Sequence, residues 1–126
     1  MMKKPNIQAR LTTSADMTTD ILGTVVKDST KYTEPEIVLA MKTNIMKSFL
    51  EKGIIDTHIP EILDRIDDGI LLELFNYPDN RYTAGVIINY IVANLAMCGI
   101  YPSDIYSIVQ DTIGIIRKIC IIRKIS

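Results

Sequence analysis

Hydrophobic side chains recur at intervals of three and four residues along most of the chain, which is the pattern of helices that bury one face. The clearest example spans residues 33–53. Thr33, Pro35 and Glu36 form a typical helix start, with a threonine N-cap and a glutamate three residues later. Gly53 follows as a typical helix end. The sequence therefore predicts a helix between these signals.

The rest of the chain after this helix is also predicted to be helical. Further helices are expected over residues 58–67, 70–75, 81–98 and from 103 toward the C-terminus. The run IIRKI at 115–119 recurs at 121–125, and a repeat of six residues would also keep equivalent side chains on one face of a strand. Residues 115–126 are therefore helix or strand, with helix favoured.

The first 32 residues show a different pattern. Polar and apolar residues alternate over 6–11, a threonine-rich stretch follows, and residues 21–26 form a β-branched patch. We expect an extended arm or small hairpin over 1–32 and a helical domain over 33–126. The predicted fold class is all-α, or mainly α: a compact bundle of about four to five helices with an extended or small β N-terminal segment.

Length and composition indicate one folded domain. The chain has 126 residues, 48% of them hydrophobic, and its 14 basic and 15 acidic side chains give a net charge of -1. This balance argues against nucleic acid as a partner. Cys98 and Cys120 are too few for a disulfide framework, so we expect buried, reduced thiols. The first ten residues do not resemble a signal peptide, which favours a cytoplasmic protein.

Charge is unevenly distributed along the chain. Residues 61–80 hold six carboxylates and one arginine, whereas residues 113–126 hold four cations and no carboxylate. The acidic segment predicts a partner-binding surface, formed by Glu61, Asp64, Asp67 and Asp68. No second acidic helix complements it and His58 is the only histidine, so neither a metal site nor a cofactor is expected.

No charged side chain occurs over residues 82–103. This stretch approaches the length of a membrane span, but Asn89 and Asn94 argue against membrane insertion, and we expect a buried helix at the centre of the core. Small or short polar side chains recur along it at helical spacing, where another helix could approach closely: Gly85, Asn89, Ala93 and Ala96.

Apolar side chains cover an unusually wide arc of the last predicted helix. The helices predicted over residues 33–53 and 81–98 have apolar faces of their own to bury. Part of the arc on the last helix would therefore remain uncovered within one chain. Uncovered apolar surface on a soluble protein marks a partner site. We therefore expect a homo-oligomer that forms through the last helix.

Function is weakly specified by the sequence. No nucleotide-binding or hydrolase motif is present, so an enzyme is not expected. The first hypothesis is a non-enzymatic interaction protein, an adaptor, regulator or inhibitor of another protein, with an isoleucine-rich composition typical of AT-rich genomes such as those of phages. The alternative is a small-ligand or nucleotide-binding protein with a pocket at the subunit interface. That pocket would be lined by Asn89, Tyr90, Asn94, Arg117 and Arg123.

Overall fold

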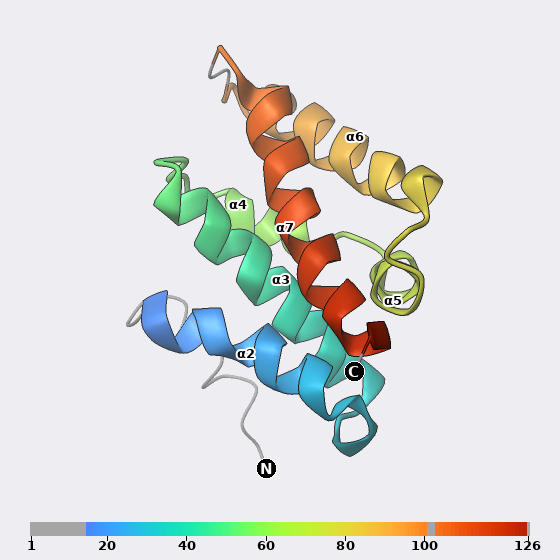
Figure 1. The fold of residues 1–126 in the computed structure, drawn as a ribbon. Coiled ribbons are helices and arrows are strands. Elements are labelled where there is room, and N and C mark those ends of the chain that lie inside the picture. Colours follow the sequence, from blue (N-terminus) through green and yellow to red (C-terminus); the bar gives the residue numbers. More distant parts are fainter. Residues whose placement is uncertain (1–14, 101–102, 126) are drawn as a thin grey trace.

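The fold is an all-α bundle, as predicted (Figure 1). The computed structural model describes residues 15–100 and 103–125, and side chains over 21–100 and 103–121. This part of the chain holds no strand and one more helix than the upper limit expected. Its elements are α2 (Ala15–Lys27), the 3-10 turn η1 (Ser29–Lys31), α3 (Glu34–Glu51), α4 (Ile59–Asp64), α5 (Asp68–Asn76), α6 (Arg81–Met97) and α7 (Ile105–Ile125).

The predicted signals at the ends of α3 are confirmed. The Thr33 hydroxyl accepts a hydrogen bond from the Glu36 backbone N–H at 3.3 Å, and the Glu36 carboxylate accepts one from the Thr33 N–H at 2.8 Å. Gly53 follows the helix with φ of 82°, a left-handed conformation that glycine adopts without strain. Gly99 ends α6 in the same way, with φ of 81°.

The centre of the core is α3, and the prediction that the uncharged helix would lie there is wrong. α3 packs against α2, α4, α5 and α7, and it buries ten residues, with Met41, Ile45 and Phe49 fully enclosed. α6 instead covers one side of the bundle. It buries a single face and leaves Asn89 and Ala93 exposed.

The N-terminal segment also differs from expectation. The predicted arm or hairpin over 1–32 is wrong for Ala15–Lys27, which form helix α2, and residues 1–14 lie outside the described residues. Leu22, Val25 and Val26 fall at helical spacing on one face and pack into the core against α3 and α7. The β-branched patch therefore supplies the buried face of a helix instead of a strand.

Much of the described part of the last helix is covered within a single chain. α7 contacts α2, α3, α5 and α6, and Figure 1 shows it running across the bundle between them. Its fully buried residues are Val109, Thr112, Ile113, Ile116 and Cys120. It stays helical to Ile125, which rejects the strand alternative over 115–125. α2 and α5 cover part of the apolar arc that the sequence left uncovered, whereas Ile115 remains 42% exposed.

Two further expectations concern the cysteines and the membrane. Cys120 is buried as predicted, but Cys98 is exposed at the end of α6, so the prediction of two buried thiols is wrong for Cys98. Among the described helices, including α6, none combines the length and hydropathy needed to cross a bilayer.

A buried hydroxyl pair joins α3 to α7 and gives a first prediction. Ser48 Oγ and Thr112 Oγ1 lie 3.1 Å apart in the core. Thr112→Val should lower the free energy of unfolding by about 1–3 kcal/mol, because it leaves the Ser48 hydroxyl buried without this partner. Urea denaturation measures the change.

Thr43 provides the matched control for this substitution. It is equally buried, but its hydroxyl has no hydrogen-bond partner among the residues described. Thr43→Val replaces that hydroxyl by a methyl group of similar size, so stability should be unchanged or raised by up to about 1 kcal/mol. Equal losses in the two variants would contradict the assigned role of the Ser48–Thr112 pair.

Candidate functional site

An open groove of about 400 Å³ lies between α6 and α7. α6 ends close to where α7 begins, and the two helices diverge from there (Figure 1). The groove is lined by Arg81, Ala84, Gly85 and Ile88 from α6 and by Tyr106, Gln110, Ile113, Gly114 and Arg117 from α7. Its floor is apolar, and its polar side chains include two arginines.

Arg117 is held in place by the turn that precedes α6. Its Nε donates a hydrogen bond of 2.6 Å to the backbone carbonyl of Pro78, which is buried in that turn. A guanidinium has five N–H groups, so this bond leaves donors for other partners. Arg81 is exposed as the first residue of α6. Neither arginine forms an ion pair with a residue of the described parts of the chain.

The start of α6, beside the groove, is fixed by a small polar network. The Asn80 side chain caps the helix by accepting from the Thr83 N–H at 3.1 Å. The Asn80 amide and the Thr83 hydroxyl both donate to one carboxylate oxygen of Glu73, at 3.2 and 3.1 Å. These hydrogen bonds hold α5 against the first turn of α6, and so fix the position of the Arg81 backbone beside the groove.

The ligand-binding residues predicted from the sequence are not brought together. Arg117 lines the groove, but Asn89 is exposed on another face of α6. The Asn94 amide donates to the Tyr90 carbonyl of its own helix at 2.8 Å. Since α6 rises about 1.5 Å per residue, Asn94 lies roughly 20 Å along the helix from its first residue, near the end remote from Arg117. The side chain of Arg123 lies outside the described residues.

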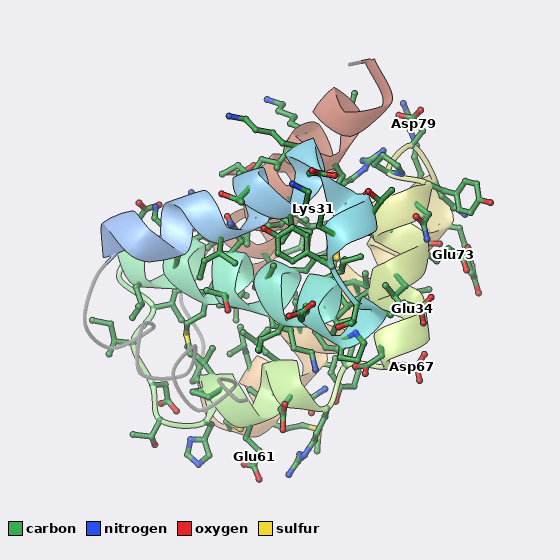
Figure 2. All side chains as sticks on the ribbon, turned by 90° about the horizontal axis from the view of Figure 1, so that it is seen from below. Lys31, Glu34, Glu61, Asp67, Glu73 and Asp79 are labelled. Carbon is green, nitrogen blue, oxygen red and sulfur yellow. The ribbon has the colours of Figure 1, made fainter. Side chains whose placement is uncertain are left out.

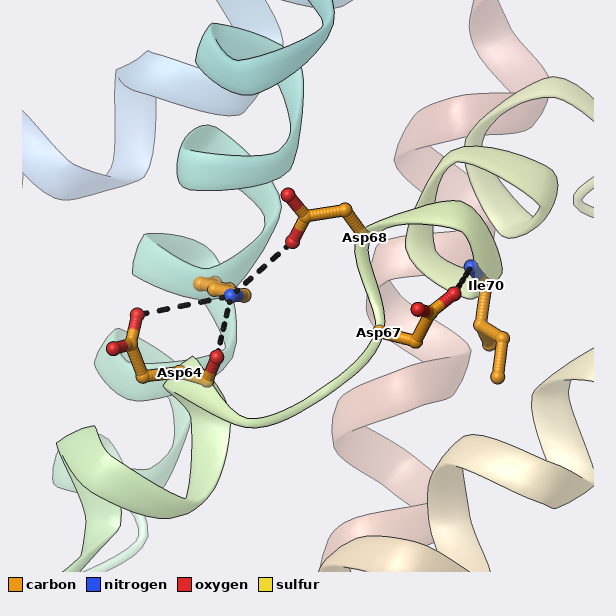
Figure 3. Close-up of polar contacts among 5 residues, drawn as sticks. Asp64, Asp67, Asp68 and Ile70 are labelled. Atoms are coloured by element: carbon orange, nitrogen blue, oxygen red, sulfur yellow. Dashed lines mark hydrogen bonds and ion pairs between the residues drawn. The ribbon is translucent and has the colours of Figure 1, made fainter.

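The four predicted partner-binding carboxylates are exposed, but each already has a local role. Lys42 of α3 lies 3.8 Å from the Asp64 carboxylate and 3.6 Å from that of Asp68, and its Nζ donates to the Asp64 carbonyl at 3.2 Å (Figure 3). Asp67 caps α5 by accepting from the Ile70 N–H at 3.2 Å.

Glu61 completes the acidic set with a pair of its own. It binds Arg65 one turn along, at 3.0 Å. Figure 2 shows the labelled carboxylates of Glu61, Asp67, Glu73 and Asp79 spread along one edge of the molecule, not gathered at one point. This edge is a dispersed acidic surface with intramolecular partners.

His58 pairs with Asp56 beside α4. The backbone N–H of His58 donates to Asp56 at 2.8 Å, and its Nδ1 lies 2.6 Å from the same oxygen. These hydrogen bonds hold the pKa of the Asp56 carboxyl below its ordinary value. Within the described residues, no group of three or more histidine, cysteine or carboxylate side chains has the arrangement to hold a metal ion.

A second surface feature is the outer face of α6. Tyr82 is 81% exposed at its start and Met97 is 83% exposed at its end, with Asn89 and Ala93 exposed between them. These positions follow each other at helical spacing and form one stripe, which we call the α6 outer face. No charged side chain lies on it after Arg81.

The sequence did not single out Arg81, Tyr106 or Gln110. The available signal was spacing: Tyr106, Gln110, Gly114 and Arg117 recur every three or four residues and share one face of α7. No protein-family model matches the chain, and neither the curated proteins nor the solved structures include a significant match. The functional argument therefore rests on the geometry of the groove and of the α6 outer face.

Proposed function

We propose that the chain is a non-enzymatic interaction protein, of the adaptor, regulator or inhibitor kind, that acts as a helical homo-oligomer. The observation that carries the proposal is the α6 outer face, where large apolar side chains stand exposed on a helix with no charge after its first residue. Exposed apolar surface of this kind is used for association. We assign the contact to α6, because Tyr82 and Met97 are about twice as exposed as Ile115 of α7.

A second copy is the partner that suits the charge of this face. In a twofold dimer the same surface patch meets itself, so any charge on it would face a like charge. The α6 outer face avoids that repulsion. The edge with Glu61, Asp64 and Asp68 would instead repel its own copy, and its carboxylates are already paired.

The dimensions of α6 suggest how two copies would pack. A helix of 17 residues is about 25 Å long, and two antiparallel copies would place Tyr82 of one near Met97 of the other. Aromatic rings and thioether sulfurs make favourable contacts. Ala93 and Ala96 are small, so the two backbones can approach closely.

A lysine at Ala93 tests this dimer. Ala93 is exposed within the stripe, so a lysine there would place one charged side chain from each copy in the apolar contact. We expect light scattering to give a dimer mass for the natural sequence at low and high salt, since the contact is apolar. Ala93→Lys should give a monomer with unchanged thermal unfolding.

Thr57→Lys is the control for the added charge. Thr57 is exposed in the connection between α3 and α4 and is not part of the α6 outer face, so this variant should remain dimeric. A monomer for the natural sequence, or a dimer that survives Ala93→Lys, would contradict self-association through α6.

A further inference from the structure

The groove between α6 and α7 has the chemistry of an anion site, and we infer that it binds a small phosphorylated ligand of nucleotide type. The phosphate group of the ligand lies between Arg81 and Arg117, and the rest of the ligand covers the apolar floor of the groove. The groove is complete within one chain, so this inference does not depend on the proposed dimer.

The first argument is charge. Two guanidinium groups line the groove, no carboxylate of a described residue lines it, and neither arginine forms an ion pair with a described residue. Arg81 also occupies the first position of α6, where the positive end of the helix dipole disfavours a cation. A phosphate here would be stabilised by both guanidinium groups and by the helix end.

The second argument is the pair of glycines that face this groove. Gly85 and Gly114 lie inside helices, where glycine is less stable than alanine by roughly 0.5–1 kcal/mol. A Cβ at either position would have no other atom within 4 Å. Packing within the chain therefore does not require a glycine at these positions. The missing side chains widen the groove and let a ligand approach the backbone.

The third argument is the remaining lining. Ala84, Ile88 and Ile113 give an apolar floor, while Tyr106 is half exposed and Gln110 exposed at the rim. An aromatic ring can stack on a planar base, and an amide both donates and accepts hydrogen bonds. The volume of about 400 Å³ falls in the range of small-molecule sites. These features fit an organic phosphate better than a free inorganic ion.

Titration of the full chain with AMP, adenosine and inorganic phosphate tests the site. We expect AMP to raise the thermal unfolding temperature and to give a calorimetric binding signal, with inorganic phosphate weaker and adenosine weakest. Arg81→Ala should weaken AMP binding by roughly tenfold or more, because a charge-assisted hydrogen bond is lost. Lys118→Ala removes an exposed cation of α7 that does not line the groove, and it should bind AMP like the natural sequence.

A second variant blocks the groove without removing charge. Gly114→Leu places a side chain into open space, so it should keep the fold and abolish AMP binding. Gly23→Ala replaces a helix glycine of α2 that also has open space around it but does not line the groove, and it should leave AMP binding unchanged.

Three results would overturn the inference. These are the absence of any stabilisation by AMP or phosphate, equal losses of affinity in Arg81→Ala and Lys118→Ala, and retained AMP binding in Gly114→Leu. Because the groove belongs to one chain, a monomeric protein that binds AMP would reject the α6 dimer and still support this site.

Discussion

Leu22→Asp is expected to unfold the protein or to lower its free energy of unfolding by roughly 5 kcal/mol or more. Leu22 is fully buried where α2 packs on α3 and α7. The substitution removes the packing of a leucine, which is worth about 2–5 kcal/mol, and it also places a carboxylate in an apolar environment. Circular dichroism with urea denaturation measures the loss.

Thr24→Asp introduces the same charge two residues away. Thr24 is exposed on the outer side of α2, so this variant should change stability by no more than about 0.5 kcal/mol. Similar, small effects of the two substitutions would mean that α2 does not belong to the core. That outcome would support the N-terminal arm that the sequence predicted, separate from the helical core.

Phe49→Ala is expected to destabilise the protein by about 3–5 kcal/mol. Phe49 is one of the largest fully buried side chains and lies in α3, the helix that contacts α2, α4, α5 and α7. Its removal loses apolar burial and leaves a cavity that neighbouring helices can fill only in part. The midpoint of urea unfolding should fall accordingly.

Leu50→Ala is the neighbouring control. Leu50 follows Phe49 in the same helix but is 40% exposed, so it contributes less burial and its loss opens no enclosed cavity. We expect less than half of the destabilisation seen for Phe49→Ala. A larger effect at Leu50 would show that the C-terminal turns of α3 pack differently.

The helices with strong end signals were predictable from sequence. The Thr33–Glu36 capping box and Gly53 bounded α3 closely, and the Asn80 cap and Gly99 bounded α6. Such signals depend on hydrogen bonds and backbone conformations within a few residues. Because these signals act over a few residues, a short segment of sequence is enough to predict where such a helix begins and ends.

The helix α2 was missed for the opposite reason. Its C-terminal half holds Ile21, Val25 and Val26, and β-branched residues favour strands in isolation. Helical structure prevails because Leu22, Val25 and Val26 form one face against α3 and α7. That packing joins segments from opposite ends of the chain, and no local pattern reveals it.

The groove was only partly accessible to sequence reasoning. Arg117 was identified, but it was combined with Asn89, which lies on another face of α6, and with Asn94, which lies toward the end of α6 remote from Arg117. Spacing places the lining residues of each helix on one face of that helix, but which face of α6 meets which face of α7 depends on how the two helices cross. Which side chains of α6 are exposed depends on how the whole bundle packs, so the sequence alone did not predict it.

The contact between α2 and α7 also has a consequence for folding kinetics. These two helices are separated by almost the whole chain, so their packing belongs to the long-range contacts that slow folding. During synthesis α2 and α3 emerge before α7, and their apolar faces stay incompletely covered until α7 has left the ribosome. The nascent chain is therefore more open to aggregation, or to a chaperone, until α7 can pack.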